Sequence, residues 1–122
     1  MALDVACLYE TARAGGQLSV AWSLLSDQSQ ATIGSLSSFA TIETAYNAQG
    51  GTAFLLQAPT QDPNLVAIFL GNLHAEIATQ ADSSRGFLVF VRHPNIAAES
   101  AGTTALYVAP LRSGGWRIWL VH

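Results

Sequence analysis

Residues 87–91 read Phe-Leu-Val-Phe-Val, and residues 105–109 read Ala-Leu-Tyr-Val-Ala. After the turn sequence at 113–115, Ser-Gly-Gly, residues 116–121 read Trp-Arg-Ile-Trp-Leu-Val. Each run is short, rich in β-branched or aromatic residues, and bounded by residues that favour turns, a pattern typical of β-strands. We therefore predict three strands at the end of the chain, and these strands decide the fold class.

The first part of the chain has helical periodicity instead. Serines that can cap a first turn and glycines that can end a helix divide it into separate segments. Helices are predicted over residues 2–14, 19–25, 26–33 and 39–48, the third capped by Ser26-Asp27 and the last by Ser37-Ser38.

The first predicted helix has two faces. Its apolar stripe is Leu3, Ala6, Cys7 and Tyr9, and its polar face is Asp4, Glu10 and Arg13. Such a division predicts that the stripe packs on the core while the charged residues face solvent. The single cysteine, Cys7, is then expected to be a buried thiol.

The middle of the chain predicts a strand over residues 52–58, closed by Pro59. Asp62-Pro63 is a strong helix-start signal, because aspartate caps a helix and proline fits its first position. Helical spacing then continues to Ala81, with a break at Gly71, although residues 65–70 also suit a strand.

Helices followed by antiparallel strands indicate a single α+β domain over residues 1–122, with N-terminal helices packed on one face of a curved antiparallel sheet.

Composition restricts the classes of function. The chain has no lysine, five arginines and eight carboxylates, and only 11% of its residues are charged. Without a basic surface, nucleic-acid binding is not expected. No apolar run is long enough to span a membrane, and no signal peptide opens the sequence. The sequence does not decide the cellular compartment, which is either the cytoplasm or an extracytoplasmic location reached after removal of a leader or anchor.

Several short motifs resemble the nuclear transport factor 2-like (cystatin-like) superfamily. They are Leu8-Tyr9, Ala14-Gly15-Gly16-Gln17, the segment Ala21-Trp22-Ser23-Leu24-Leu25-Ser26, and the segment Gly114-Gly115-Trp116-Arg117-Ile118-Trp119. The resemblance implies a cone-shaped fold in which helices and a bent sheet surround a pocket. That superfamily includes ketosteroid isomerase-like enzymes, polyketide cyclases, transport factors and non-catalytic accessory domains, so the fold alone does not choose a function.

Isomerase chemistry of that kind needs a carboxylate base and an oxyanion hole with a neutral carboxylic acid. The resemblance places the base soon after the second helix and the acid on a late strand. Residues 28–42 and 103–111 contain no carboxylate, and Asp27 suits a helix cap. We therefore expect no catalytic residue and no cofactor, and a non-catalytic binding or assembly domain. The alternative is a small-molecule-binding protein or an enzyme of the ketosteroid isomerase or polyketide cyclase type, using Tyr9, Asp27 and His93.

Metal binding is not predicted either. His74 and Glu76 lie two residues apart, a spacing that places them on different faces of a helix. Arg92-His93 follows a buried strand and could orient a ligand at a pocket mouth, but a strand end emerging into solvent is the favoured interpretation.

A pocket for a small apolar ligand remains as a hypothesis. Large aromatic and polar side chains could line it, although simple core filling explains the same aromatic residues. The candidate ligand-binding residues are Tyr9, Trp22, Asp27, Tyr46, His93, Tyr107 and Trp119.

The predicted strands have large apolar residues on both faces, whereas a two-layer domain buries only one. The second face must be covered, because large apolar patches are rare on monomers. Residues 62–81 could wrap over it. The low charge count favours the alternative, a symmetric homodimer that pairs through the sheet.

Overall fold

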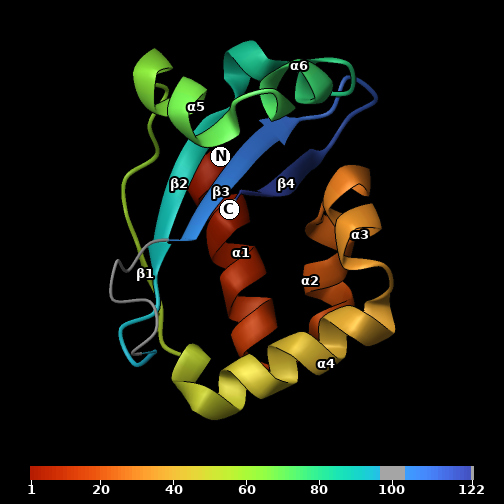
Figure 1. Cartoon of the computed structure of the whole chain (residues 1–122), viewed down its shortest axis with the longest axis vertical. Helices are drawn as coiled ribbons and strands as arrows, with labels where there is room; N and C mark the ends of the chain where they lie inside the picture. Colours follow the sequence, from red (N-terminus) through yellow and green to blue (C-terminus); the bar gives the residue numbers. More distant parts are fainter. Residues whose placement is uncertain (97–103, 122) are drawn as a thin grey trace.

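The computed structural model describes residues 1–96 and 104–121, and it confirms the α+β class (Figure 1). Its N-terminal helices precede a curved, four-stranded antiparallel sheet with the strand order β1-β2-β3-β4. The elements are α1 (Ala2–Ala14), α2 (Leu18–Leu24), α3 (Asp27–Ile33), α4 (Leu36–Tyr46), a π-helical turn (Asn47–Gly51), β1 (Leu55–Leu56), α5 (Pro63–Leu70), α6 (Leu73–Ala78), a 3₁₀ turn (Ser83–Arg85), β2 (Phe87–Arg92), β3 (Thr104–Pro110) and β4 (Trp116–Val121).

The three C-terminal strands match their predicted ranges closely. In the β2–β3 pair, Phe87 lies opposite Val108, and in the β3–β4 pair Tyr107 lies opposite Trp119. The predicted connection over residues 96–101 falls mainly outside the described residues.

The predicted strand over residues 52–58 is much shorter in the structure. Only β1, Leu55–Leu56, pairs with β2, because Thr52 still has a helical backbone conformation and Pro59 has no N–H to donate. The chain stays beside β2 through the Gln57 N–H, which donates to the Phe90 carbonyl, and through a bridge between Thr60 and Leu88.

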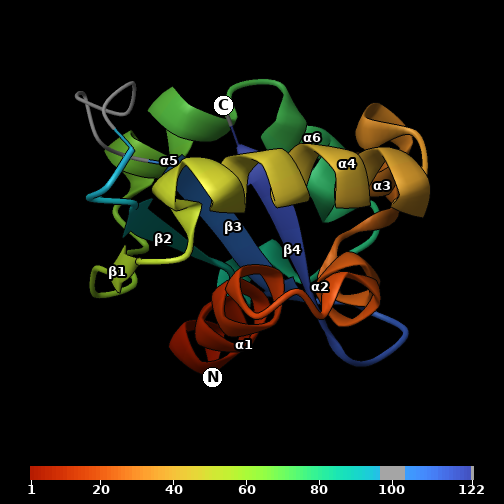
Figure 2. The same cartoon turned by 90° about the horizontal axis from the view of Figure 1, so that it is seen from below.

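Helices cover both faces of the sheet, as Figure 2 shows. α1 and α2 lie on one side in this view, and α4 crosses in front of the strands. Phe39 of α4 belongs to the core on the side of α1 and α2, to which the strands contribute Val89, Val91, Leu106, Val108 and Ile118. We call this side of the sheet the first face. On the opposite, second face, α5 and α6 pack against Leu88, Ala105, Tyr107, Ala109, Trp119 and Val121. Residues 62–81 therefore cover the second face, as the first of the two alternatives predicted.

The boundaries in the second half follow the helix signals. Asp62 caps α5 by accepting a hydrogen bond from the Asn64 N–H at 2.9 Å, with Pro63 at the first helical position. Gly71 ends α5 with a φ of 52°, a backbone conformation that glycine adopts without steric cost. The helix interpretation of residues 65–70 is confirmed.

The start of α4 differs from the prediction. Its N-cap is Ser35, whose side chain accepts a hydrogen bond from the Ser38 N–H at 3.1 Å, so the helix begins before the predicted Ser37-Ser38 cap. The physical reason is local, because several serines in a row can each cap a helix.

This difference is testable. We expect Ser35→Ala to lower the free energy of unfolding by about 1 kcal/mol, the usual cost of losing a capping serine. Ser37→Ala is the matched control and should change it by less than about 0.5 kcal/mol. Urea denaturation of both variants measures this, and the reverse order of the two effects would contradict the observed cap.

The division of α1 into two faces was wrong in part. Ala6 and Tyr9 are buried as predicted, but Leu3 and Cys7 are exposed. Glu10 and Arg13 are instead buried, each with only 2% of its surface exposed. The helix is rotated relative to the prediction because these two charged residues find partners inside the protein, and those partners form the candidate site.

Candidate functional site

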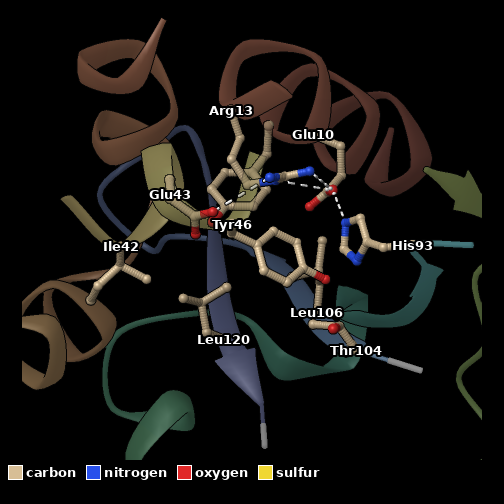
Figure 3. A pocket seen from close by; sticks show the side chains of 10 residues that line it. Glu10, Arg13, Ile42, Glu43, Tyr46, His93, Thr104, Leu106 and Leu120 are labelled. Carbon is tan, nitrogen blue, oxygen red and sulfur yellow. Dashed lines mark hydrogen bonds and ion pairs between the residues drawn. The ribbon is translucent and has the colours of Figure 1, made fainter. Parts of the chain in front are cut away.

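A cavity of about 180 Å³ lies between α1, α4 and the first face of the sheet (Figure 3). It has an apolar side made by Ile42, Leu106 and Leu120, and a polar side made largely by α1 and α4. The lining residues are Tyr9, Glu10, Arg13, Ile42, Glu43, Tyr46, His93, Thr104, Leu106 and Leu120.

Arg13 is the centre of the polar side. Its Nε and Nη2 both donate to Glu10 Oε1, at 3.3 and 3.2 Å, and Nη2 also donates to the Gly51 carbonyl. Its Nη1 donates to Asn47 Oδ1 at 2.7 Å and to Glu43 Oε2 at 3.4 Å. A guanidinium has five N–H groups, so these five bonds use all of its donors. Arg13 therefore ties α1 to the end of α4 and to the π-helical turn.

His93 joins this network from the end of β2. Its Nε2 lies 2.7 Å from Glu10 Oε1, and its ring is 4% exposed. The next segment turns back at once, since the Ile96 N–H donates to the His93 carbonyl. His93 thus lies inside the protein while its neighbour Arg92 is exposed, which corrects the favoured interpretation of this pair as a solvent-facing strand end.

The pocket perturbs the ionisation of two of its groups. Burial, followed by the negative charges of Glu43 and Glu10, raises the pKa of the Tyr9 phenol far above its ordinary value. Burial also raises the pKa of the Glu43 carboxyl, and the nearby Arg13 guanidinium offsets part of that increase. The cavity is therefore an environment that opposes further negative charge.

The raised pKa of Glu43 gives a prediction about pH. A carboxyl whose pKa is raised by folding stabilises the folded state below the ordinary pKa of glutamate, and this contribution is lost as the pH rises through the raised value. Glu43→Gln keeps an uncharged group at every pH. We therefore expect the free energy of unfolding of the variant to increase, relative to that of the wild type, as the pH rises from about 4 to about 8. Urea unfolding across that range measures the difference. A stability difference that does not change with pH would contradict the raised pKa.

The structure brings together three of the seven predicted ligand residues. Tyr9, Tyr46 and His93 all line the cavity, and the Tyr46 ring lies edge-on to the His93 ring with a centroid distance of 5.2 Å. The Arg13 guanidinium lies over the same Tyr46 ring, with its Cζ 5.4 Å from the ring centroid. These three aromatic side chains come from α1, α4 and the end of β2.

The other four lie elsewhere. Trp22 is half-buried against Phe39 on α4, and Asp27 is exposed in the first turn of α3, where Ser26 is the cap. Tyr107 and Trp119 pack on the second face of the sheet beneath α5 and α6, on the far side from the cavity.

Sequence reasoning missed Glu10, Arg13 and Glu43. A signal for Arg13 does exist: Ala2, Ala6, Tyr9 and Arg13 are spaced as one helical stripe, so a charged residue continues a buried face. Glu43 lies just beyond the carboxylate-free range of residues 28–42, and nothing in the local pattern of α4 marks it.

The arrangement offers hydrogen-bond acceptors, aromatic rings and an aliphatic wall. Across residues 1–96 and 104–121, no three histidine, cysteine or acidic side chains lie close enough to hold a metal ion. Among the same residues, no helix combines the length and apolarity needed to cross a membrane.

Comparisons with protein-family models, with curated proteins and with solved structures found no match to this chain.

Proposed function

We propose that this chain is a nuclear transport factor 2-like domain that binds a small molecule in the Arg13 pocket, by which we mean the cavity lined by Arg13 and its neighbours. The observation that carries the proposal is the convergence of Tyr9, Tyr46 and His93 on one cavity. This cavity lies between the helices and the first face of the curved sheet, where the resemblance implies a pocket. Its mixture of apolar wall and a few polar groups is typical of ligand sites.

Two features support binding rather than catalysis. Glu10 Oε1 lies within hydrogen-bond distance of three nitrogens, two from Arg13 and one from His93, so this oxygen is already occupied in holding the fold together. Asp27, the carboxylate that the enzymatic alternative uses, is exposed on α3 and does not line the cavity. Binding needs only the shape and polarity of the pocket, and both are present.

Ligand-observed and methyl-resolved NMR with a library of small organic fragments tests the proposal. We expect some fragments to shift the methyl signals of Ile42, Leu106 and Leu120, which line the apolar wall. The matched control is the set of methyl groups on the second face, such as those of Leu88 and Ile77, which should not respond. A library without any compound that shifts the pocket methyls would contradict the proposal.

An acid–base enzyme is the second candidate, favoured by one specific observation. A buried glutamate and a histidine lie 2.7 Å apart beside a second glutamate, Glu43, whose pKa is raised. Perturbed ionisable groups in a cavity are a common feature of active sites. Turnover of a small ketone or polyketide substrate that is lost in Tyr9→Phe, a variant that keeps the ring, would favour catalysis over simple binding.

The homodimer is a separate prediction. Because α5 and α6 cover the second face of the sheet, a pair of subunits needs another surface. Light scattering after size exclusion, at micromolar concentration, measures the mass directly. Twice the chain mass of 12.9 kDa would confirm the homodimer, and the mass of one chain would contradict it.

A further inference from the structure

The charge and hydrogen-bond pattern of the Arg13 pocket selects a chemical class of ligand. All five N–H groups of Arg13 are used by protein acceptors, so the guanidinium has no donor left for a bound anion. An anion placed in the cavity would instead meet the carboxylates of Glu10 and Glu43.

Glu10 presents an acceptor to the cavity. Its side chain is 2% exposed, and Oε1 receives the bonds from Arg13 and His93. The second oxygen, Oε2, accepts no hydrogen bond from any described residue. Among the described residues, every fully enclosed side-chain nitrogen or oxygen atom has a hydrogen-bond partner. Because Oε2 has none among them, it is not a fully enclosed atom. Figure 3 shows this second oxygen on the cavity side of the carboxylate.

Glu43 adds a second carboxylate to the same wall. Its Oε2 accepts from Arg13 Nη1 at 3.4 Å, and its side chain is 14% exposed. Two carboxylates share one guanidinium, so the polar wall attracts positive charge when both are ionised. Burial is the main cause of the raised pKa of Tyr9, and the negative charges of Glu43 and Glu10 raise it further.

We propose that the Arg13 pocket binds a small organic cation, a primary ammonium group on a short aliphatic body. This inference rests on the proposed binding function. The ammonium group donates to Glu10 Oε2 within the field of Glu43, and the rings of Tyr9 and Tyr46 line the same space. The aliphatic body lies along Leu106 and Leu120.

The size of the cavity agrees with this class. About 180 Å³ is smaller than the pockets of roughly 300–1,000 Å³ that hold drug-sized ligands. An ammonium ion also fits better than a metal ion, because it needs hydrogen-bond acceptors rather than a complete shell of ligands. A butyl chain provides enough apolar surface to contact the aliphatic wall.

The test compares three probes of equal length: butylammonium chloride, sodium butyrate and butan-1-ol. Dissociation constants come from titrations that follow the pocket methyl signals of Leu106 and Leu120. We expect butylammonium to bind at least roughly tenfold more tightly than either of the others, because a hydrogen bond between two charged groups is stronger than one to a neutral group.

Two variants assign the preference to the pocket. Glu43→Gln should weaken butylammonium binding roughly tenfold and leave butan-1-ol binding unchanged. The matched control is Asp4→Asn, which removes one exposed carboxylate from α1 away from the pocket and should change neither. Thermal melting of both variants verifies that they are folded.

The outcomes separate the two proposals. Butyrate or butan-1-ol binding as tightly as butylammonium would overturn the cation and leave the binding pocket standing. Equal loss of butylammonium binding in Asp4→Asn and Glu43→Gln would also overturn it, because the effect would then be one of net charge. If none of the three probes shifts the pocket methyls, and the fragment library also fails, the proposed function itself is contradicted.

Discussion

Replacing Arg13 with alanine is expected to lower the free energy of unfolding by about 3–5 kcal/mol, the cost of removing one partner from a buried ion pair. Glu10 would remain buried without its main partner, and Asn47 and the Gly51 carbonyl would lose a donor. For a chain of 122 residues, this corresponds to a decrease in melting temperature of roughly 10–20 °C. Calorimetry or circular dichroism measures the change.

Arg92→Ala is the matched control, since it removes an exposed arginine and the same unit of charge. Its melting temperature should stay close to that of the wild type. Arg13→Lys should still be strongly destabilised, because an ammonium group cannot reproduce five donors in a planar fork. An Arg13→Ala variant that melts within a degree or two of the wild type would show that the network does not hold α1 in place.

The second large effect is expected at Trp119. This side chain is completely buried on the second face, its ring lies edge-on to Tyr107, and its Nε1 donates to Gln28 Oε1. Trp119→Ala should therefore cost about 3–5 kcal/mol, from lost apolar burial and the cavity that it leaves. Chemical denaturation followed by circular dichroism measures the loss.

Trp116→Ala on the same strand is the control. Its ring is half-buried and contacts Arg85, so we expect a loss of only about 1–2 kcal/mol. Equal losses at the two tryptophans would contradict the placement of Trp119 beneath α5 and α6.

The strands and most helix limits could be predicted because their signals are local. Alternating apolar side chains identified β2, β3 and β4, and the Asp62-Pro63 start and the Gly71 break placed α5 and α6. The Ser35 cap and the short β1 were predicted less well, since neighbouring serines compete for one cap and pairing depends on a distant strand.

The candidate site could be predicted only in part. Tyr9, Tyr46 and His93 stand out as large or titratable residues beside predicted core segments. Glu10 lies 83 positions before His93, and no local pattern relates residues so far apart. A buried charge is expensive unless it is paired, so the pattern of α1 alone predicts that its charged face meets solvent. The partners that make burial possible come from other elements.

The two walls of the pocket differ in how freely they can evolve. A substitution of Arg13 or Glu10 loosens α1 as well as altering recognition, so changes at these two residues carry a large stability penalty. Ile42 is 57% exposed and adds little to the core, although it borders the same cavity. Selection for a longer or bulkier ligand, natural or in the laboratory, can therefore act through Ile42 and leave the scaffold intact.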